Sequence, residues 1–98
     1  MVDLNYFCKE IDNLIEKLGG YWPKEWLLQP VMEELGEFAK ELQIDAGLHP
    51  DKTTSEETLS EEFGDLLFAV IALGRGLKID VEQALQKSIE KYHKRDTK

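Results

Sequence analysis

The sequence predicts an all-α fold of four helices in a four-helix bundle-like domain. Apolar residues recur at intervals of three and four in four successive segments, no segment shows the sustained apolar–polar alternation of a strand, and glycines or capping residues separate the segments. The 98 residues suffice for one small core, so we expect a single helical domain over residues 1–98. Each apolar face is wide for so short a chain, and we therefore expect a homo-oligomer, either a homodimer or a homotetramer.

The first helix is expected over residues 4–18. Asp3 is a suitable N-cap, and Gly19 and Gly20 supply the stop. Cys8, the only cysteine of the chain, is expected to be a buried apolar residue and not a nucleophile. The apolar positions with helical spacing are Leu4, Phe7, Cys8, Ile11, Leu14, Ile15 and Leu18.

The second apolar segment runs from about residue 23 to residue 44. Pro23 suits a first helical turn, but Pro30 lies inside the stretch, so either the helix begins near Pro30 or it is kinked there. The apolar stripe comprises Leu27, Leu28, Val31, Met32, Leu35, Phe38, Ala39 and Leu42.

The third segment follows a loop near residues 47–53. Its first residues are typical of a capping box, with Thr54 as N-cap and Glu57 three residues later, and it is expected to end near Gly74 or Gly76. Its apolar face comprises Leu59, Phe63, Leu66, Leu67, Val70, Ile71 and Leu73.

The fourth segment begins at Asp80, a good N-cap with Gln83 three residues later. Its last turns carry Lys91, Lys94 and Arg95, which complement the negative end of a helix dipole. The apolar stripe comprises Val81, Ala84, Leu85, Ile89 and Tyr92.

The charge balance excludes several kinds of partner. Twelve basic and 20 acidic residues give a formal net charge of -8, so nucleic acid polymers and anionic membrane surfaces are poor partners. The longest apolar run, residues 66–73, is far shorter than the roughly 20 residues that cross a bilayer, and we do not expect the first residues to form a signal peptide. We expect a cytoplasmic protein.

An acidic motif occurs twice and is the most informative feature of the chain. Residues 33–38 read EELGEF and residues 61–66 read EEFGDL. Helical geometry places Glu34 and Glu37 on one flank of the apolar face of the second segment. It places Glu62 and Asp65 on the corresponding flank of the apolar face of the third segment.

If the two helices pack antiparallel, these four carboxylates converge at the edge of the core. Their mutual repulsion is relieved by a divalent cation, and oxygen ligands favour Mg²⁺ or Mn²⁺. The glycine of each motif suggests close helix approach or room for a ligand, and the small side chains of Ala69 and Ala72 leave a groove beside the metal. A solvated acidic face explains either motif alone, whereas the matched pair favours a metal site.

These residues resemble the MazG-like nucleotide pyrophosphohydrolases, an all-α family marked by E-E-x-x-E and E-x-x-D. The resemblance spans about residues 22–95. It rests on Glu33-Glu34-x-x-Glu37, on Glu62-x-x-Asp65 followed by Leu66-Leu67-Phe68, and on the downstream segments GLKID at 76–80 and KYHKR at 91–95.

The resemblance implies that Glu34, Glu37, Glu62 and Asp65 are Mg²⁺ ligands. It implies hydrolysis of a nucleoside triphosphate, ordinary or aberrant, to the monophosphate and pyrophosphate, in a house-cleaning role. One departure concerns Ala72, because many members have Asn at this position, seven residues after the motif Asp, where it helps to hold substrate or metal.

The remaining candidate residues serve proton transfer and substrate binding. A carboxylate not fully committed to metal can accept a proton from the attacking water, and Glu37 or Glu33 is the candidate catalytic residue. Glu33 can equally be a solvated surface residue.

Basic and aromatic residues supply the candidate substrate contacts. Lys91 and Arg95, at i and i+4, match the basic pair of the family and either contact phosphates or only complement the helix end. Trp22 and Trp26 are candidates for stacking on the base, and packing in the core or at an oligomer interface is the alternative.

Two other functions are compatible with the sequence. Phosphoribosyl-ATP pyrophosphohydrolase has the same kind of motif, although residues 66–68 and 91–95 favour the MazG-like branch. A catalytically silent helical oligomerisation or regulatory module is the second alternative, with Ala72 as its best support.

Overall fold

The structure, a computed structural model, describes residues 2–96, and these residues confirm the predicted all-α fold. They form four α-helices and one short 3-10 helix, with no strand among them. In chain order the elements are α1 (Leu4–Lys17), η1 (Lys24–Trp26), α2 (Gln29–Asp45), α3 (Glu56–Gly76) and α4 (Val81–Asp96).

The predicted ends of α1 and the predicted start of α4 are confirmed. The Asp3 carboxylate accepts a hydrogen bond of 2.9 Å from the backbone N–H of Tyr6, and the Asp80 carboxylate accepts one of 3.0 Å from the N–H of Gln83. Gly19 and Gly20 follow α1 with φ angles of 112° and 94°, a region that favours glycine and ends the helix.

The second segment is divided, so its predicted start at Pro23 is wrong. A 3-10 turn covers Lys24–Trp26, and α2 begins at Gln29 with Pro30 in its first turn. Proline is tolerated there because the first N–H groups of a helix have no partner within the helix. The alternative that the helix begins near Pro30 is thus confirmed.

The N-cap of α3 is one residue later than the capping box predicts. Ser55 caps the helix, with its Oγ accepting a hydrogen bond of 3.1 Å from the N–H of Thr58. The helix ends at Gly76, one of the two predicted positions, and Lys78 then takes a left-handed conformation with a φ of 61°.

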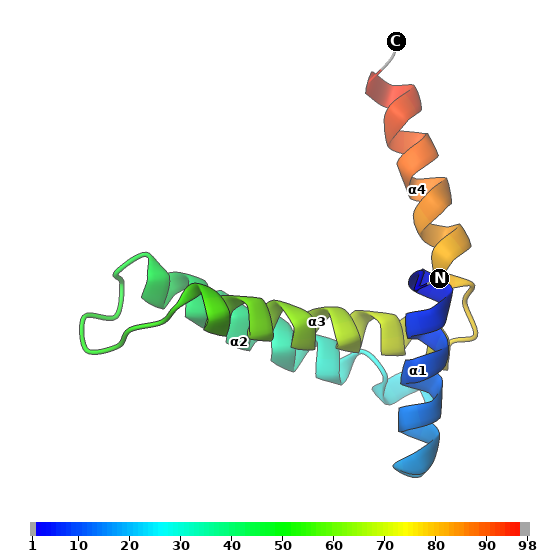
Figure 1. Ribbon diagram of the computed structural model, residues 1–98, viewed down its shortest axis with the longest axis horizontal. Helices are drawn as coiled ribbons and strands as arrows, with labels where there is room; N and C mark the ends of the chain where they lie inside the picture. Colours follow the sequence, from blue (N-terminus) through cyan, green and yellow to red (C-terminus); the bar gives the residue numbers. More distant parts are fainter. Residues whose placement is uncertain (1, 97–98) are drawn as a thin grey trace.

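The helices form a hairpin with two further helices at one end. Helices α2 and α3 lie side by side, α1 crosses near the C-terminal end of α3, and α4 projects away from the hairpin (Figure 1). The core between α1 and α3 is built from Cys8, Ile11 and Ile71, and Cys8 is only 3% exposed, as predicted.

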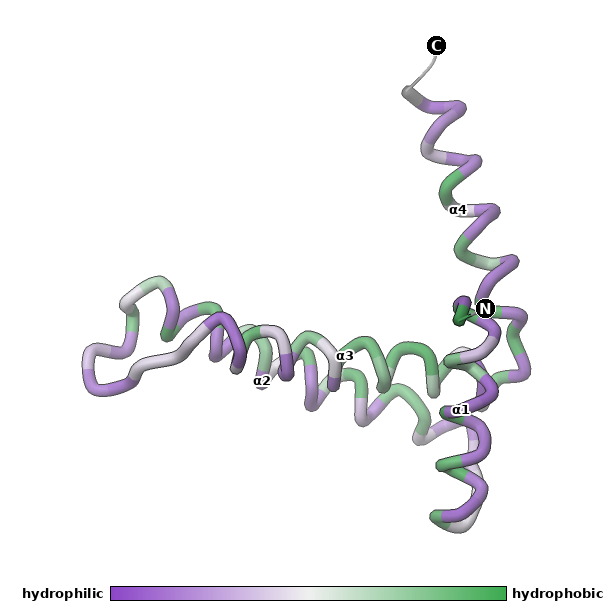
Figure 2. The backbone as a smooth tube through the Cα atoms, in the orientation of Figure 1, coloured by the Kyte–Doolittle hydropathy of each residue, from purple (hydrophilic) through white to green (hydrophobic). Residues whose placement is uncertain are grey.

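One copy of the chain leaves much of its apolar surface uncovered. Hydrophobic residues recur along α2, α3 and α4 (Figure 2). Met32 and Leu35 on α2, and Leu85, Ile89 and Tyr92 on α4, are about half exposed or more. No helix in residues 2–96 is long and apolar enough to cross a membrane.

Candidate metal centre

Three carboxylates converge where α2 and α3 pack together. Glu34 lies on α2, while Glu62 and Asp65 are separated by one turn of α3. One oxygen from each carboxylate lies within 4.8 Å of those of the other two. Side chains that are 28 and 31 residues apart in the sequence therefore offer a compact group of acidic oxygens.

The oxygens of this cluster have the properties of metal ligands. Glu34 Oε2 and Glu62 Oε2 are buried and have no hydrogen-bond partner. Burial, followed by the charges of Glu37 and Asp65, raises the pKa of both Glu34 and Glu62 above the ordinary glutamate value. Because an unpartnered buried carboxylate oxygen is unfavourable, a hard divalent cation fits this donor set.

The other two acidic candidates lie at the margin of the cluster. Within the described residues, Glu37 is not a member of the three-oxygen group, and both Glu37 and Glu33 are exposed. The charge of Glu37 acts on both Glu34 and Glu62, and that of Glu33 acts on Glu34. Glu37 is therefore close enough to influence the site electrostatically without sharing the central position.

A groove of about 530 Å³ adjoins the carboxylates. Glu34 and Asp65 line it together with Ala69 and Ala72, which agrees with the expected groove beside small residues. The rest of the lining is chiefly apolar: Ile15, Leu18, Gly20, Tyr21, Trp22, Leu27, Pro30, Phe68 and Leu73. The site thus combines negative charge with a hydrophobic slot for a flat or apolar group.

The glycines of the two acidic motifs do not mark close packing within this chain. A Cβ atom built on Gly36 or Gly64 meets no other atom within 4 Å. The first predicted explanation, close approach between helices of one copy, is therefore wrong. The second, room for a ligand beside the motifs, stays a prediction.

The candidate substrate residues divide into two groups. Trp22 lines the groove and Trp26 does not, although the two side chains are about equally exposed, at 57% and 56%. Lys91 and Arg95 border a separate hollow on α4 and lie 5.3 and 5.2 Å from the ring centre of Tyr92. In one copy the basic pair therefore does not line the groove that Glu34 and Asp65 border.

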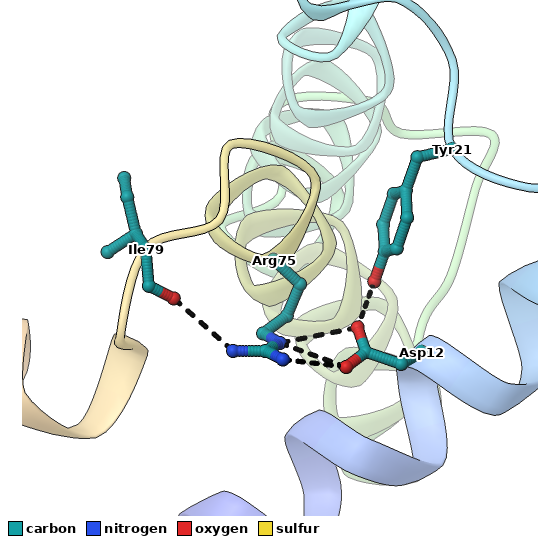
Figure 3. Close-up of polar contacts among 4 residues, drawn as sticks. All are labelled: Asp12, Tyr21, Arg75 and Ile79. Carbon is teal, nitrogen blue, oxygen red and sulfur yellow. Dashed lines mark hydrogen bonds and ion pairs between the residues drawn. The ribbon is translucent and has the colours of Figure 1, made fainter.

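A polar clasp at the groove was not predicted from the sequence. Asp12 on α1 accepts hydrogen bonds from Arg75 Nε at 3.2 Å and Arg75 Nη2 at 2.8 Å, and its Oδ1 accepts one of 2.6 Å from the Tyr21 hydroxyl (Figure 3). Arg75 Nη1 also donates to the carbonyl oxygen of Ile79 at 3.4 Å. We refer to Asp12, Tyr21 and Arg75 as the clasp.

The clasp also shifts the pKa values of Asp12 and Tyr21. The Arg75 guanidinium, helped by the Tyr21 hydroxyl, holds the pKa of Asp12 below the ordinary value, while burial and the Asp12 charge raise the pKa of Tyr21. Asp12 and Arg75 are 63 positions apart, so no spacing signal in the sequence links them. The one signal in the sequence is that Tyr21 directly precedes Trp22, a candidate for stacking on the base.

Fold and acidic motif together define the class of protein. The profile of the MazG nucleotide pyrophosphohydrolase domain matches residues 23–98, most of the chain, and the chain belongs to this family.

Individual relatives agree with that assignment. The chain is 34% identical over 89 residues to the uncharacterized protein YpjD of Bacillus subtilis, covering 89% of this chain and 80% of that one. The crystal structure of YpjD superposes with a TM-score of 0.82 at 31% identity, over 94% of this chain and 98% of the other. The Bacillus-conserved MazG protein, a nucleotide pyrophosphohydrolase, superposes with a TM-score of 0.79 at 29% identity, over 94% and 90%.

Longer relatives match over part of their length. The nucleoside triphosphate pyrophosphohydrolase MazG of Thermotoga maritima is 38% identical over 65 residues, which are 66% of this chain and 22% of that protein. The chain spans about a fifth of that relative.

Proposed function

We propose that this protein is a Mg²⁺-dependent nucleoside triphosphate pyrophosphohydrolase that converts a (d)NTP and water to the (d)NMP and pyrophosphate. One observation carries the proposal: two buried, unpartnered glutamate oxygens and a third carboxylate form one cluster, and its members Glu34 and Asp65 line an otherwise chiefly apolar groove. The arrangement suits a ligand with a charged phosphate end and a flat base.

Glu34, Glu62 and Asp65 are the proposed principal ligands, with Glu37 as the fourth. Bound Mg²⁺ would neutralise phosphate charge and make a water more acidic. In the overall reaction the water oxygen bonds to the α-phosphorus, the α–β anhydride bond breaks, and pyrophosphate leaves. The exposed Glu37 carboxylate is the proposed acceptor of the water proton, with Glu33 as the second candidate.

The groove supplies the proposed site for the nucleoside. The Trp22 indole lines it and is the proposed stacking partner of the base. Trp26 lies outside the lining of this copy, so its proposed contact with substrate requires a ligand that extends beyond the groove.

We propose that the active form is a homodimer or homotetramer. The exposed apolar residues of α4 and α2 need a cover, and a second copy offers a self-complementary surface. Lys91 and Arg95, remote from the groove in their own chain, would then serve the phosphates in another copy. A cytoplasmic role in clearing unwanted nucleotides fits such an activity.

The direct test is a panel of NTPs and dNTPs incubated with the full chain and Mg²⁺ or Mn²⁺. Pyrophosphate and nucleoside monophosphate should appear in equal amounts, orthophosphate should not, and chelation of the metal should stop the reaction. Phosphoribosyl-ATP, assayed in parallel, tests the related activity. The proposal fails if a folded, oligomeric sample releases pyrophosphate from no nucleotide.

The silent helical module has one structural observation in its favour. Ala72, where many family members carry Asn, lines the groove with a methyl group that offers no hydrogen bond. The nucleotide panel also decides this alternative, because a silent module would release no pyrophosphate.

A further inference from the structure

We propose that Tyr21 contacts the nucleobase in the groove and that Asp12 and Arg75 are positioning residues that hold its ring there. The inference rests on the proposed function and adds a base contact made by the clasp. Tyr21 lies outside the acidic motifs, in the irregular segment between α1 and η1.

The Tyr21 side chain is fixed at its hydroxyl end. The hydroxyl donates a hydrogen bond of 2.6 Å to Asp12, and the same carboxylate receives three contacts from Arg75, two at 3.2 Å and one at 2.8 Å (Figure 3). The three side chains come from α1, the loop and α3. A ring on an irregular loop thus acquires a fixed position relative to two helices.

The ring is also fixed along its edge. A Cβ atom on Gly76 would lie 3.0 Å from Tyr21 Cδ1 and 2.7 Å from Leu27 Cδ1. The missing side chain at Gly76 therefore lets both Tyr21 and Leu27, which line the groove, pack directly on the last residue of α3.

The chemistry of this wall suits a base and not a phosphate. The hydroxyl of Tyr21 is engaged with a carboxylate, so the ring contributes carbon surface to the groove, next to Trp22. Aromatic surface attracts a planar heteroaromatic base by stacking, independently of base identity. The acidic oxygens of Glu34 and Asp65 lie in the same groove and mark the place for the metal-bound phosphates.

The test removes the hydroxyl of Tyr21 and compares a ligand that has a base with one that lacks it. For Tyr21→Phe with Mg²⁺ present, we expect the KM for nucleoside triphosphate to rise about fivefold to tenfold, since one hydrogen bond no longer fixes the ring, with kcat within about twofold. Calorimetry should show the same loss for an α,β-methylene nucleotide analogue and none for inorganic tripolyphosphate. Asp12→Asn should act in the same direction.

Tyr6→Phe is the matched control. Its hydroxyl donates to Glu10 at 3.3 Å on the exposed face of α1, so the same chemical change there should alter neither ligand's affinity. Equal weakening of the nucleotide analogue and tripolyphosphate, or an unchanged KM in a folded Tyr21→Phe protein, overturns the inference. If the wild-type protein releases no pyrophosphate, the proposed function fails instead, so the two failures are distinct.

Discussion

The most informative residues are Glu34 and Glu62, the members of the carboxylate cluster that have a buried oxygen without a partner. Glu34 and Glu62 face Asp65 and the charge of Glu37, and burial raises the pKa of both glutamates. Such a cluster favours ligand binding over the stability of the metal-free fold.

Neutralising either glutamate should separate these two effects. In Glu34→Gln and in Glu62→Gln we expect Mg²⁺ or Mn²⁺ affinity to fall at least about tenfold. Each variant loses one charged ligand, while the other carboxylates of the cluster remain. We also expect the metal-free variants to melt higher than wild type at pH 7, because repulsion is removed. Titration calorimetry and thermal melts measure these quantities.

Glu61→Gln is the control, because Glu61 is the exposed neighbour of Glu62 and lies outside the three-oxygen group. It should bind metal as wild type does. Unchanged metal affinity in both cluster variants would contradict the proposed site.

Asp12 gives a prediction about acid stability. Its folded pKa lies below the ordinary value of 3.8, so its contribution is complete above that value and is lost as the pH falls through the folded pKa. Asp12→Asn should therefore cost about 1–2 kcal/mol at pH 7 and progressively less below pH 4, by the energetics of charge-assisted hydrogen bonds. Urea unfolding at pH 7 and pH 3 measures the difference, and an equal loss at both values would contradict this role.

At the scale of the elements, the end of α3 carries a correctable strain. Lys78 has a φ of 61°, and the local hydrogen bonds, from Lys78 N to Arg75 O and from Ile79 N to Gly74 O, are both 2.9 Å. Lys78→Gly should raise the free energy of unfolding by about 1 kcal/mol, since glycine adopts this conformation without Cβ repulsion. Urea denaturation gives the value.

Lys87→Gly is the opposite control, because Lys87 lies inside α4. The same replacement there should lower stability by about 1 kcal/mol. A loss of stability in Lys78→Gly as well would show that the left-handed turn stores no relievable strain.

The sequence predicts those elements whose signals are local. Asp3 and Asp80 cap their helices through neighbours three residues away, and Pro30 limits the start of α2 within one turn. The repeated acidic spacing likewise predicts the meeting of Glu34 with Asp65. Each of these results depends on short-range geometry or on one helix pair.

The remainder depends on long-range packing. The Asp12–Arg75 contact joins residues 63 apart, and no periodicity specifies it. The projection of α4 away from the α2–α3 hairpin, which separates Lys91 from the groove, is equally non-local (Figure 1). The N-cap shift from Thr54 to Ser55 shows that adjacent hydroxyl residues compete on nearly equal terms.

At the scale of the whole molecule, the proposed oligomer brings the basic pair of one copy, Lys91 and Arg95, to the carboxylate cluster of another. Lys91→Ala/Arg95→Ala and Glu34→Gln/Glu62→Gln should each be inactive alone, if the basic pair of one copy serves the carboxylates of another. Mixed 1:1 after unfolding and refolding together, they should recover about a quarter of wild-type activity in a dimer, because half the dimers are mixed and each has one intact site. Pyrophosphate release measures the recovery.

Light scattering on the same samples supplies the control, since the chain mass is 11.3 kDa and an oligomer must be a multiple of it. Leu85→Glu/Ile89→Glu should shift the mass toward one chain by placing charge on the exposed stripe of α4. An oligomeric mixture with no recovered activity would contradict the shared site.

The burial of Cys8 has a kinetic consequence. Its thiol is 3% exposed between α1 and α3, and burial raises its pKa, so a thiol reagent reaches it chiefly when α1 separates from α3. The labelling rate of Cys8 therefore measures how often the contact between α1 and α3, which the clasp spans, opens. Asp12→Asn should accelerate labelling while Lys9→Ala, on the exposed side of α1, should not. Because Asp12 on α1 accepts the hydrogen bond of the Tyr21 hydroxyl, the same labelling rate also reports how often the separation of α1 releases that hydroxyl.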